Sequence, residues 1–145
     1  MKFSTKTRYA LRFMINLGCN SKSGNIQLND IAKTENISVK YLSQIVLPLK
    51  SSGLITSERG ARGGYRLAKQ PSCISIRTIV ELFEGSLYPT DCITDRSVCK
   101  KNTHCITQKV WKRAGDALIS TLDNIHLDEL VDECIQNRQL FNYSI

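Results

Sequence analysis

Apolar residues in the first 50 positions recur every three to four residues, which is the spacing of one buried face of an α-helix. The pattern predicts a first helix over residues 5–19 and a shorter second helix over residues 28–36. Gly24 and Asn25 interrupt the pattern between them. Ser38 is a residue type that caps helices well, so a third helix is expected directly after it. The apolar stripe of this third helix consists of Leu42, Ile45, Val46 and Leu49.

Two short strand-like runs follow, at residues 54–57 and 65–68. The segment between them, residues 58–64, holds three glycines and two arginines. Glycine permits a tight turn, so Arg59 and Arg62 would project from the tip of a hairpin. A phosphate-binding loop is excluded, because such loops end in Lys-Ser or Lys-Thr and lead into a helix. The three helices and the hairpin predict a mainly α fold with a small β-wing, a winged helix-turn-helix domain.

The second half of the chain shows helical spacing at both ends and none in the middle. A long helix over 104–125, with Thr103 as its cap, has a longer apolar stripe than so small a core needs, which favours pairing with a second copy. We therefore divide the chain into a winged DNA-binding domain at 1–85, a cysteine-bearing loop at 86–103, a dimerisation helix at 104–125 and a C-terminal helix at 126–145 that packs back on the core.

The charges are unevenly distributed. Residues 1–70 carry 12 Lys and Arg against 3 acidic residues, whereas residues 71–145 carry 8 against 10. Clustered cations attract polyanions, so the first half is the candidate binder of double-stranded DNA. The side chains expected to contact bases or phosphates are Ser38, Lys40, Tyr41, Ser43, Gln44, Arg59 and Arg62.

Two function classes are disfavoured. The chain has no apolar run approaching the ~20 residues that span a bilayer, so we expect no membrane association and a cytoplasmic location. It also lacks a Ser-His-Asp set, a catalytic carboxylate pair or a phosphate loop, so we expect no enzymatic activity.

Three of the six cysteines, Cys92, Cys99 and Cys105, lie within fourteen otherwise polar residues. Thiolates are soft ligands, so this group predicts a metal or iron–sulfur site. Zinc binding and thiol–disulfide switching remain alternatives. The scattered cysteines, Cys19, Cys73 and Cys134, are expected to be small buried residues.

The chain resembles the Rrf2 family of bacterial winged-helix regulators. The resemblance lies in Thr7-Arg8-Tyr9-Ala10-Leu11, Ile31-Ala32, Tyr41-Leu42-x2-Ile45, Gly53-Leu54-Ile55-x3-Arg59-Gly60 and Gly63-Gly64-Tyr65-x-Leu67. It implies a homodimer on a palindromic operator, with the recognition helix in the major groove and the wing arginine in the minor groove.

The cysteine pattern is closest to the subgroup that regulates iron–sulfur cluster biogenesis. This likeness implies an iron–sulfur cluster on the three cysteines, with [2Fe–2S] favoured over [4Fe–4S]. That subgroup has a histidine three residues after the last cysteine, where this chain has Gln108. The candidates for a fourth ligand are His104, Asp91, Asp95, Gln108 and Cys73.

The predicted function is a dimeric transcriptional regulator whose operator binding is controlled by a cluster that responds to redox state, nitric oxide or iron. The alternatives are a cluster-free Rrf2 repressor controlled by a partner enzyme of cysteine metabolism, and a thiol or zinc switch.

Overall fold

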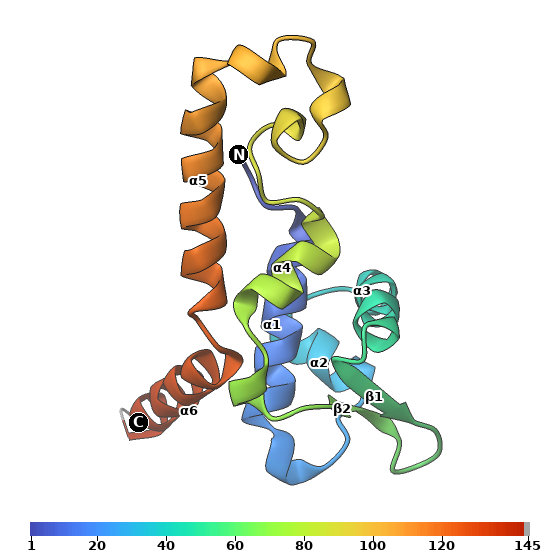
Figure 1. Cartoon of the computed structure of the whole chain (residues 1–145). Coiled ribbons are helices and arrows are strands. Elements are labelled where there is room, and N and C mark those ends of the chain that lie inside the picture. Colours follow the sequence, from blue (N-terminus) through green and yellow to red (C-terminus); the bar gives the residue numbers. More distant parts are fainter. Residues whose placement is uncertain (144–145) are drawn as a thin grey trace.

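The computed structural model describes residues 1–143, so the last two residues of the predicted segment 126–145 lie outside the described residues. This part of the chain forms six α-helices, five 3₁₀ turns and one two-stranded antiparallel sheet, in agreement with the predicted mainly α fold with a small wing (Figure 1). The elements are α1 (Thr5–Cys19), η1 (Ser21–Ser23), α2 (Leu28–Glu35), α3 (Val39–Ser51), β1 (Ile55–Glu58), β2 (Gly64–Leu67), η2 (Pro71–Cys73), α4 (Ile76–Glu84), η3 (Asp91–Ile93), η4 (Arg96–Val98), η5 (Asn102–His104), α5 (Ile106–Asp123) and α6 (Leu127–Tyr143).

Helix α1 is the centre of the core. Its first turn is capped by Ser4, whose side chain accepts a hydrogen bond from the Thr7 backbone N–H at 3.2 Å. The fully buried apolar side chains of α1 are Ala10, Phe13, Met14 and Leu17. Near its end, Gly18 lets α6 approach closely, because a Cβ there would lie 2.4 Å from Cγ2 of Val131. Helices α2, α3, α4 and α6 all pack on α1.

The turn between α2 and α3 fixes the angle at which α3 leaves the core. Asn36 ends α2 in the left-handed region at φ 53°, a conformation that asparagine tolerates better than most residues. Ile37 is buried behind this turn, and Ser38 caps α3 by accepting a hydrogen bond from the Tyr41 N–H at 3.1 Å. The predicted third helix is thereby confirmed, and it continues past Pro48 to Ser51.

The wing strands are displaced by one residue from the predicted runs. Strand β1 pairs with β2 from Ile55 opposite Leu67 to Glu58 opposite Gly64. Leu54 is not part of β1, because its N–H closes the end of α3 on the carbonyl of Leu49 at 3.1 Å. Gly64 lies at φ +133°, and a Cβ there would stand 2.5 Å from the carbonyl oxygen of Ile26, so the chain requires glycine at this point.

The long helix α5 begins two residues later than predicted. His104 belongs to η5, Cys105 occupies the N-cap position, and Thr103 therefore does not cap α5. Residues 86–103, predicted to be irregular, contain three 3₁₀ turns. Figure 1 shows α5 standing beside α4, with these turns at one end of the molecule and the wing at the other.

Tyr88, in the segment after α4, packs on the middle of helix α5. The Tyr88 ring lies on Gly115, and its hydroxyl donates a hydrogen bond to Asp116 at 2.8 Å. Nearer the start of α5, three apolar side chains are exposed to solvent. The exposed fractions there are 83% for Ile106, 56% for Val110 and 40% for Trp111. Within residues 1–143, no helix combines the length and the apolar character that crossing a membrane requires.

Candidate nucleic-acid interface and cysteine loop

The outward face of α3 is mainly polar, with Val39 and Leu47 as exposed apolar residues. Lys40, Ser43 and Gln44 are exposed, as predicted for a recognition helix. Leu47 shares this face, one turn further along the helix, and is 68% exposed. Leu47 is not among the predicted DNA contacts, because a leucine within an apolar stretch is usually buried. An exposed leucine beside polar residues can contact a thymine methyl group.

Three of the predicted DNA contacts also build the helix that carries them. Ser38 is the helix cap, and the Ser43 hydroxyl donates to the Val39 carbonyl at 2.9 Å. Tyr41 is half-buried, with its ring edge-on to that of Tyr9 at 5.5 Å between centroids. Their contact with DNA stays a prediction, and their hydrogen bonds and packing position α3.

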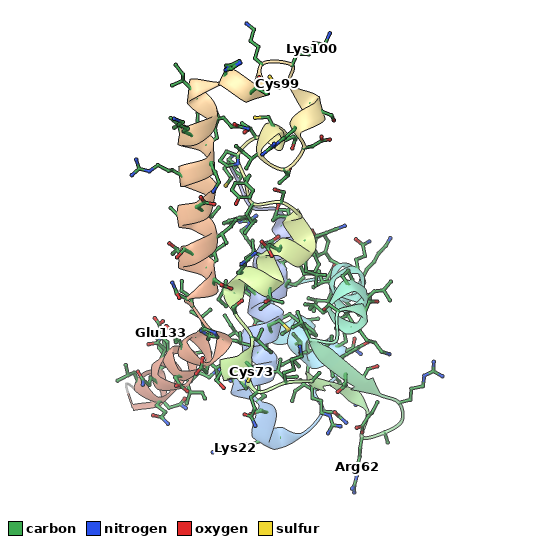
Figure 2. The ribbon with its side chains drawn as sticks, in the orientation of Figure 1. Lys22, Arg62, Cys73, Cys99, Lys100 and Glu133 are labelled. Carbon is green, nitrogen blue, oxygen red and sulfur yellow. The ribbon has the colours of Figure 1, made fainter. Side chains whose placement is uncertain are left out.

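The wing presents two arginines to solvent. Arg59 and Arg62 are exposed and form no ion pair within residues 1–143, whereas Arg66 pairs with Glu58 at 3.1 Å. Figure 2 shows Arg62 projecting away from the body of the wing. Unpaired guanidinium groups on a narrow hairpin are suited to the minor groove, where negative potential concentrates.

Asn25 holds the wing tip in place. Its side-chain N–H₂ donates to the Glu58 carboxylate at 2.9 Å and to the Arg62 carbonyl at 3.2 Å. Directly after it, Ile26 exchanges two backbone hydrogen bonds with Tyr65, at 2.8 and 2.9 Å. In the sequence, Asn25 is visible only as a break in helical spacing, so its role in the site was missed.

The three clustered cysteines lie along one segment, residues 86–105, which we call the cysteine loop. Cys92 is in η3, Cys99 follows η4, and Cys105 precedes α5; each is half-buried. Two of them have a threonine neighbour, since Cys92 Sγ lies 3.4 Å from Thr90 Oγ1 and Cys105 Sγ lies 3.2 Å from Thr107 Oγ1.

The pKa of the Cys105 thiol lies below its ordinary value. The hydroxyl of Thr107 contributes most, by donating a hydrogen bond to the sulfur, and the backbone N–H of Gln108 contributes next. The start of a helix presents such N–H groups, and they favour a thiolate over a thiol. Lys101 adds a smaller electrostatic effect.

Gln108 anchors the cysteine loop to α5. Its side-chain N–H₂ donates to the carbonyl of Cys92 at 3.1 Å. Of the other proposed fourth ligands, Asp95 accepts hydrogen bonds from the Ser97 N–H at 2.8 Å and the Ser97 hydroxyl at 2.6 Å, and these lower the pKa of Asp95. His104 and Asp91 are exposed.

Cys73 lies far from the cysteine loop. It belongs to η2, and Figure 2 shows it in the opposite half of the molecule from Cys99. Cys73 is exposed, which contradicts the expectation that it is buried. It is the last residue of a short 3₁₀ turn after the wing, and its side chain faces solvent although α6 packs against this turn. Cys19 and Cys134 are half-buried.

A cavity of about 630 Å³ opens between the cysteine loop and the start of α5. Cys99 lines it, together with the cationic side chains of Arg96, Lys100 and Lys112. Within residues 1–143, no group of three His, Cys, Asp or Glu side chains is arranged to hold a metal ion. The residues fit an anionic iron–sulfur cluster in their chemistry, through soft sulfur ligands, a helix start and a cationic lining, without forming a closed ligand set.

The chain matches known proteins along most of its length. The family model for Rrf2, described as an iron-dependent transcriptional regulator, matches residues 3–133. The HTH-type transcriptional regulator CymR of Bacillus subtilis strain 168 is 38% identical over 130 residues, which are 90% of this chain and 89% of CymR. The HTH-type transcriptional regulator IscR of Escherichia coli O1:K1 is 35% identical over 132 residues, 91% of this chain and 81% of IscR.

A solved structure agrees with these matches. That of CymR, the global cysteine regulator of B. subtilis, has a TM-score of 0.77 at 36% identity and covers 92% of this chain and 98% of CymR. These relatives are named as transcriptional regulators and not as enzymes. This chain, with its winged helix-turn-helix, therefore belongs to the Rrf2 family of transcriptional regulators.

Proposed function

We propose that this regulator acts in the cytoplasm as a homodimer, and that an iron–sulfur cluster on Cys92, Cys99 and Cys105 controls its binding to a palindromic operator. The observation that carries the proposal is the gathering of three thiols on one loop that is anchored to the start of α5. The description of the family model as iron-dependent supports it.

Residues 1–85 would read the DNA. Helix α3 enters the major groove with Lys40 and Gln44, and the wing follows the adjacent minor groove with Arg59 and Arg62. The support is the exposure of these four side chains and the lack of an ion pair at either arginine among residues 1–143.

Helix α5 would join two copies. Ile106, Val110 and Trp111 lie near its start and are largely exposed, which is unfavourable for apolar side chains in a lone chain. Pairing with the same helix of a second copy buries them and brings the two cysteine loops next to the dimer interface.

The cysteine loop would link DNA reading by residues 1–85 to dimerisation through α5. When bound, the cluster supplies a centre that responds to redox state, nitric oxide and iron supply. The protein contributes three thiolates, a cationic cavity and the Gln108 hydrogen bond to the Cys92 carbonyl, through which loop position and α5 are coupled. We favour [2Fe–2S] over [4Fe–4S]. His104 and Asp91 are the better candidates for the fourth ligand, since Asp95 and Gln108 are already engaged in hydrogen bonds.

The test is anaerobic purification of the wild type and of the variant Cys92→Ala/Cys99→Ala/Cys105→Ala. We expect the wild type to show visible absorbance with stoichiometric iron and sulfide, and the variant to lose all three. Operator affinity, measured by fluorescence anisotropy, should change at least tenfold on cluster loss. Cys73→Ala is the matched control and should behave like the wild type. Equal absorbance and equal affinity in the triple variant would contradict the proposal.

A cluster-free regulator controlled by an enzyme of cysteine metabolism is the second candidate. The likeness to a global cysteine regulator favours it, as does the open arrangement of the three thiols. It predicts a colourless protein that forms a stable complex with such an enzyme and binds its operator only in that complex. A colourless protein with one zinc per chain, or with a disulfide within the trio, would instead indicate a zinc or thiol switch.

A further inference from the structure

Two cysteines outside the cysteine loop meet where α1 packs against α6. Cys19 is the last residue of α1, and its Sγ lies 3.8 Å from the carbonyl oxygen of Val131 in α6. Cys134 lies one turn further along α6, so it shares this face of the helix. Cys134 is also among the neighbouring groups that raise the pKa of the Cys19 thiol. The close approach at Gly18 brings the two helices near enough for this contact.

We propose that Cys19 and Cys134 form a redox-active dithiol that hydrogen peroxide converts into an intramolecular disulfide between α1 and α6. The proposal does not depend on a cluster, because neither residue belongs to the cysteine loop. Two thiols on the facing sides of packed helices need less backbone movement to form a bond than two thiols on separate segments.

The two sulfurs have different roles. Burial, and next the hydrogen bond with Cys134, raise the pKa of Cys19 to about 12, so Cys19 stays a thiol at neutral pH. Cys134 lines a cavity at this contact, and Cys19 is not among the lining residues, so the first attack on peroxide falls to Cys134. Cys19 lies across the contact between α1 and α6 and acts as the resolving thiol.

Peroxide can reach Cys134 from solvent. A cavity of about 390 Å³ is lined by Cys134, Glu133, Asn137, Arg138 and Phe141, among others. Arg138 also donates from Nη1 to Asn20 Oδ1 at 3.5 Å, which places its cationic group beside the end of α1.

The chemistry balances in two steps. The Cys134 thiolate attacks one peroxide oxygen, the O–O bond breaks, and the departing hydroxide takes up a proton to become water, which leaves a sulfenic acid on Cys134. The Cys19 sulfur then attacks the Cys134 sulfur, the S–O bond breaks as the S–S bond forms, and the hydroxide leaves as water with the proton of Cys19. The two sulfurs together give two electrons to one peroxide molecule.

The disulfide would clamp the last helix to the central one. It closes a loop of more than 100 residues, and cross-links across long loops restrict the unfolded chain most. The melting temperature of the oxidised protein should rise by about 10 °C.

The test is peptide mapping of the full-length wild-type protein after treatment with hydrogen peroxide. The remaining thiols are alkylated in denaturant before digestion, and the disulfide-linked peptides are identified by mass spectrometry. We expect a Cys19–Cys134 link in at least half of the chains. Recovery of both residues chiefly as alkylated thiols, or chiefly in links to other cysteines, would overturn the proposal, and this readout needs no variant to fold.

Two variants extend the test to stability. Cys134→Ser should abolish the peroxide-induced rise in melting temperature and leave Cys19 alkylated. The matched control, Cys73→Ser, removes an exposed cysteine elsewhere and should keep the rise. A rise that persists in Cys134→Ser would show that another oxidation is responsible, and would overturn the proposed role of the pair.

Discussion

Replacement of Asn25 by alanine tests how much the Asn25 side chain contributes to holding the wing tip in place. The side chain joins the segment before α2 to both sides of the hairpin, through Glu58 and the carbonyl of Arg62. Alanine removes both donors and leaves the backbone pairing of Ile26 with Tyr65 intact. The wing should therefore stay folded while its tip loses its fixed position.

The expected size follows from the two hydrogen bonds. A neutral hydrogen bond contributes about 0.5–1.5 kcal/mol and one to a charged group about 1.5–3 kcal/mol. Both bonds are exposed to solvent, so the lower ends apply and the loss in free energy of unfolding should be about 2 kcal/mol. On DNA the loosened tip must be ordered again, and this costs at most the same energy of about 2 kcal/mol. A tenfold change in affinity corresponds to about 1.4 kcal/mol, so the affinity of Asn25→Ala for DNA should fall by at most about 30-fold.

The assay is fluorescence anisotropy with a duplex selected in vitro by the wild-type protein, alongside urea unfolding. We expect Asn25→Ala to bind five- to thirtyfold more weakly. Asn25→Asp should bind the duplex more weakly than Asn25→Ala, because it also places a carboxylate beside Glu58. Asn142→Ala, at an exposed position of α6, is the control for loss of an amide. Binding by Asn25→Ala within twofold of the wild type, at unchanged stability, would refute the reasoning.

Three further predictions concern the wing and the N-terminal end of α1. Arg59→Ala should cost about 1–3 kcal/mol of binding and relax preference at one operator position; equal weakening on random duplexes would show a phosphate contact only. Gly64→Ala should lower the free energy of unfolding in urea by about 2–5 kcal/mol, because the new Cβ meets the backbone of Ile26 at a positive φ. The pKa of Glu84 lies below its ordinary value of 4.5, chiefly because the Thr7 hydroxyl donates to it. The carboxylate therefore stabilises the fold above pH 4.5, and this stabilisation is lost as the pH falls through the folded-state pKa. In urea titrations, Glu84→Gln should have a lower free energy of unfolding than the wild type at pH 7, and the difference should shrink towards pH 3.

Periodic burial made the helices predictable. Leu42 and Ile45 belong to a stripe of apolar residues at helical spacing, and both side chains are buried in the core. The ends of the helices were harder to predict, because several residues near an end can cap a helix equally well by local rules. Thr103 was such a residue, yet α5 starts at Ile106 with Cys105 in the N-cap position.

Contacts between distant segments left no local signal. Asn25 and Glu58 are 33 positions apart, and no spacing rule connects them. The same holds for Cys19 and Cys134, which the sequence presents as unrelated small residues. The cysteine trio was visible because its members are close together along the chain, although closeness in sequence did not produce a closed ligand set.

The placement of the cysteine loop and the wing at opposite ends of the molecule has an evolutionary consequence (Figure 1). The proposed sensing loop and the proposed DNA-reading wing share no residues, so each can change in evolution while the other keeps its sequence. Under the proposed function, exchange of residues 86–105 for those of a relative should give a chimaera that binds the same operators and responds to a different stimulus.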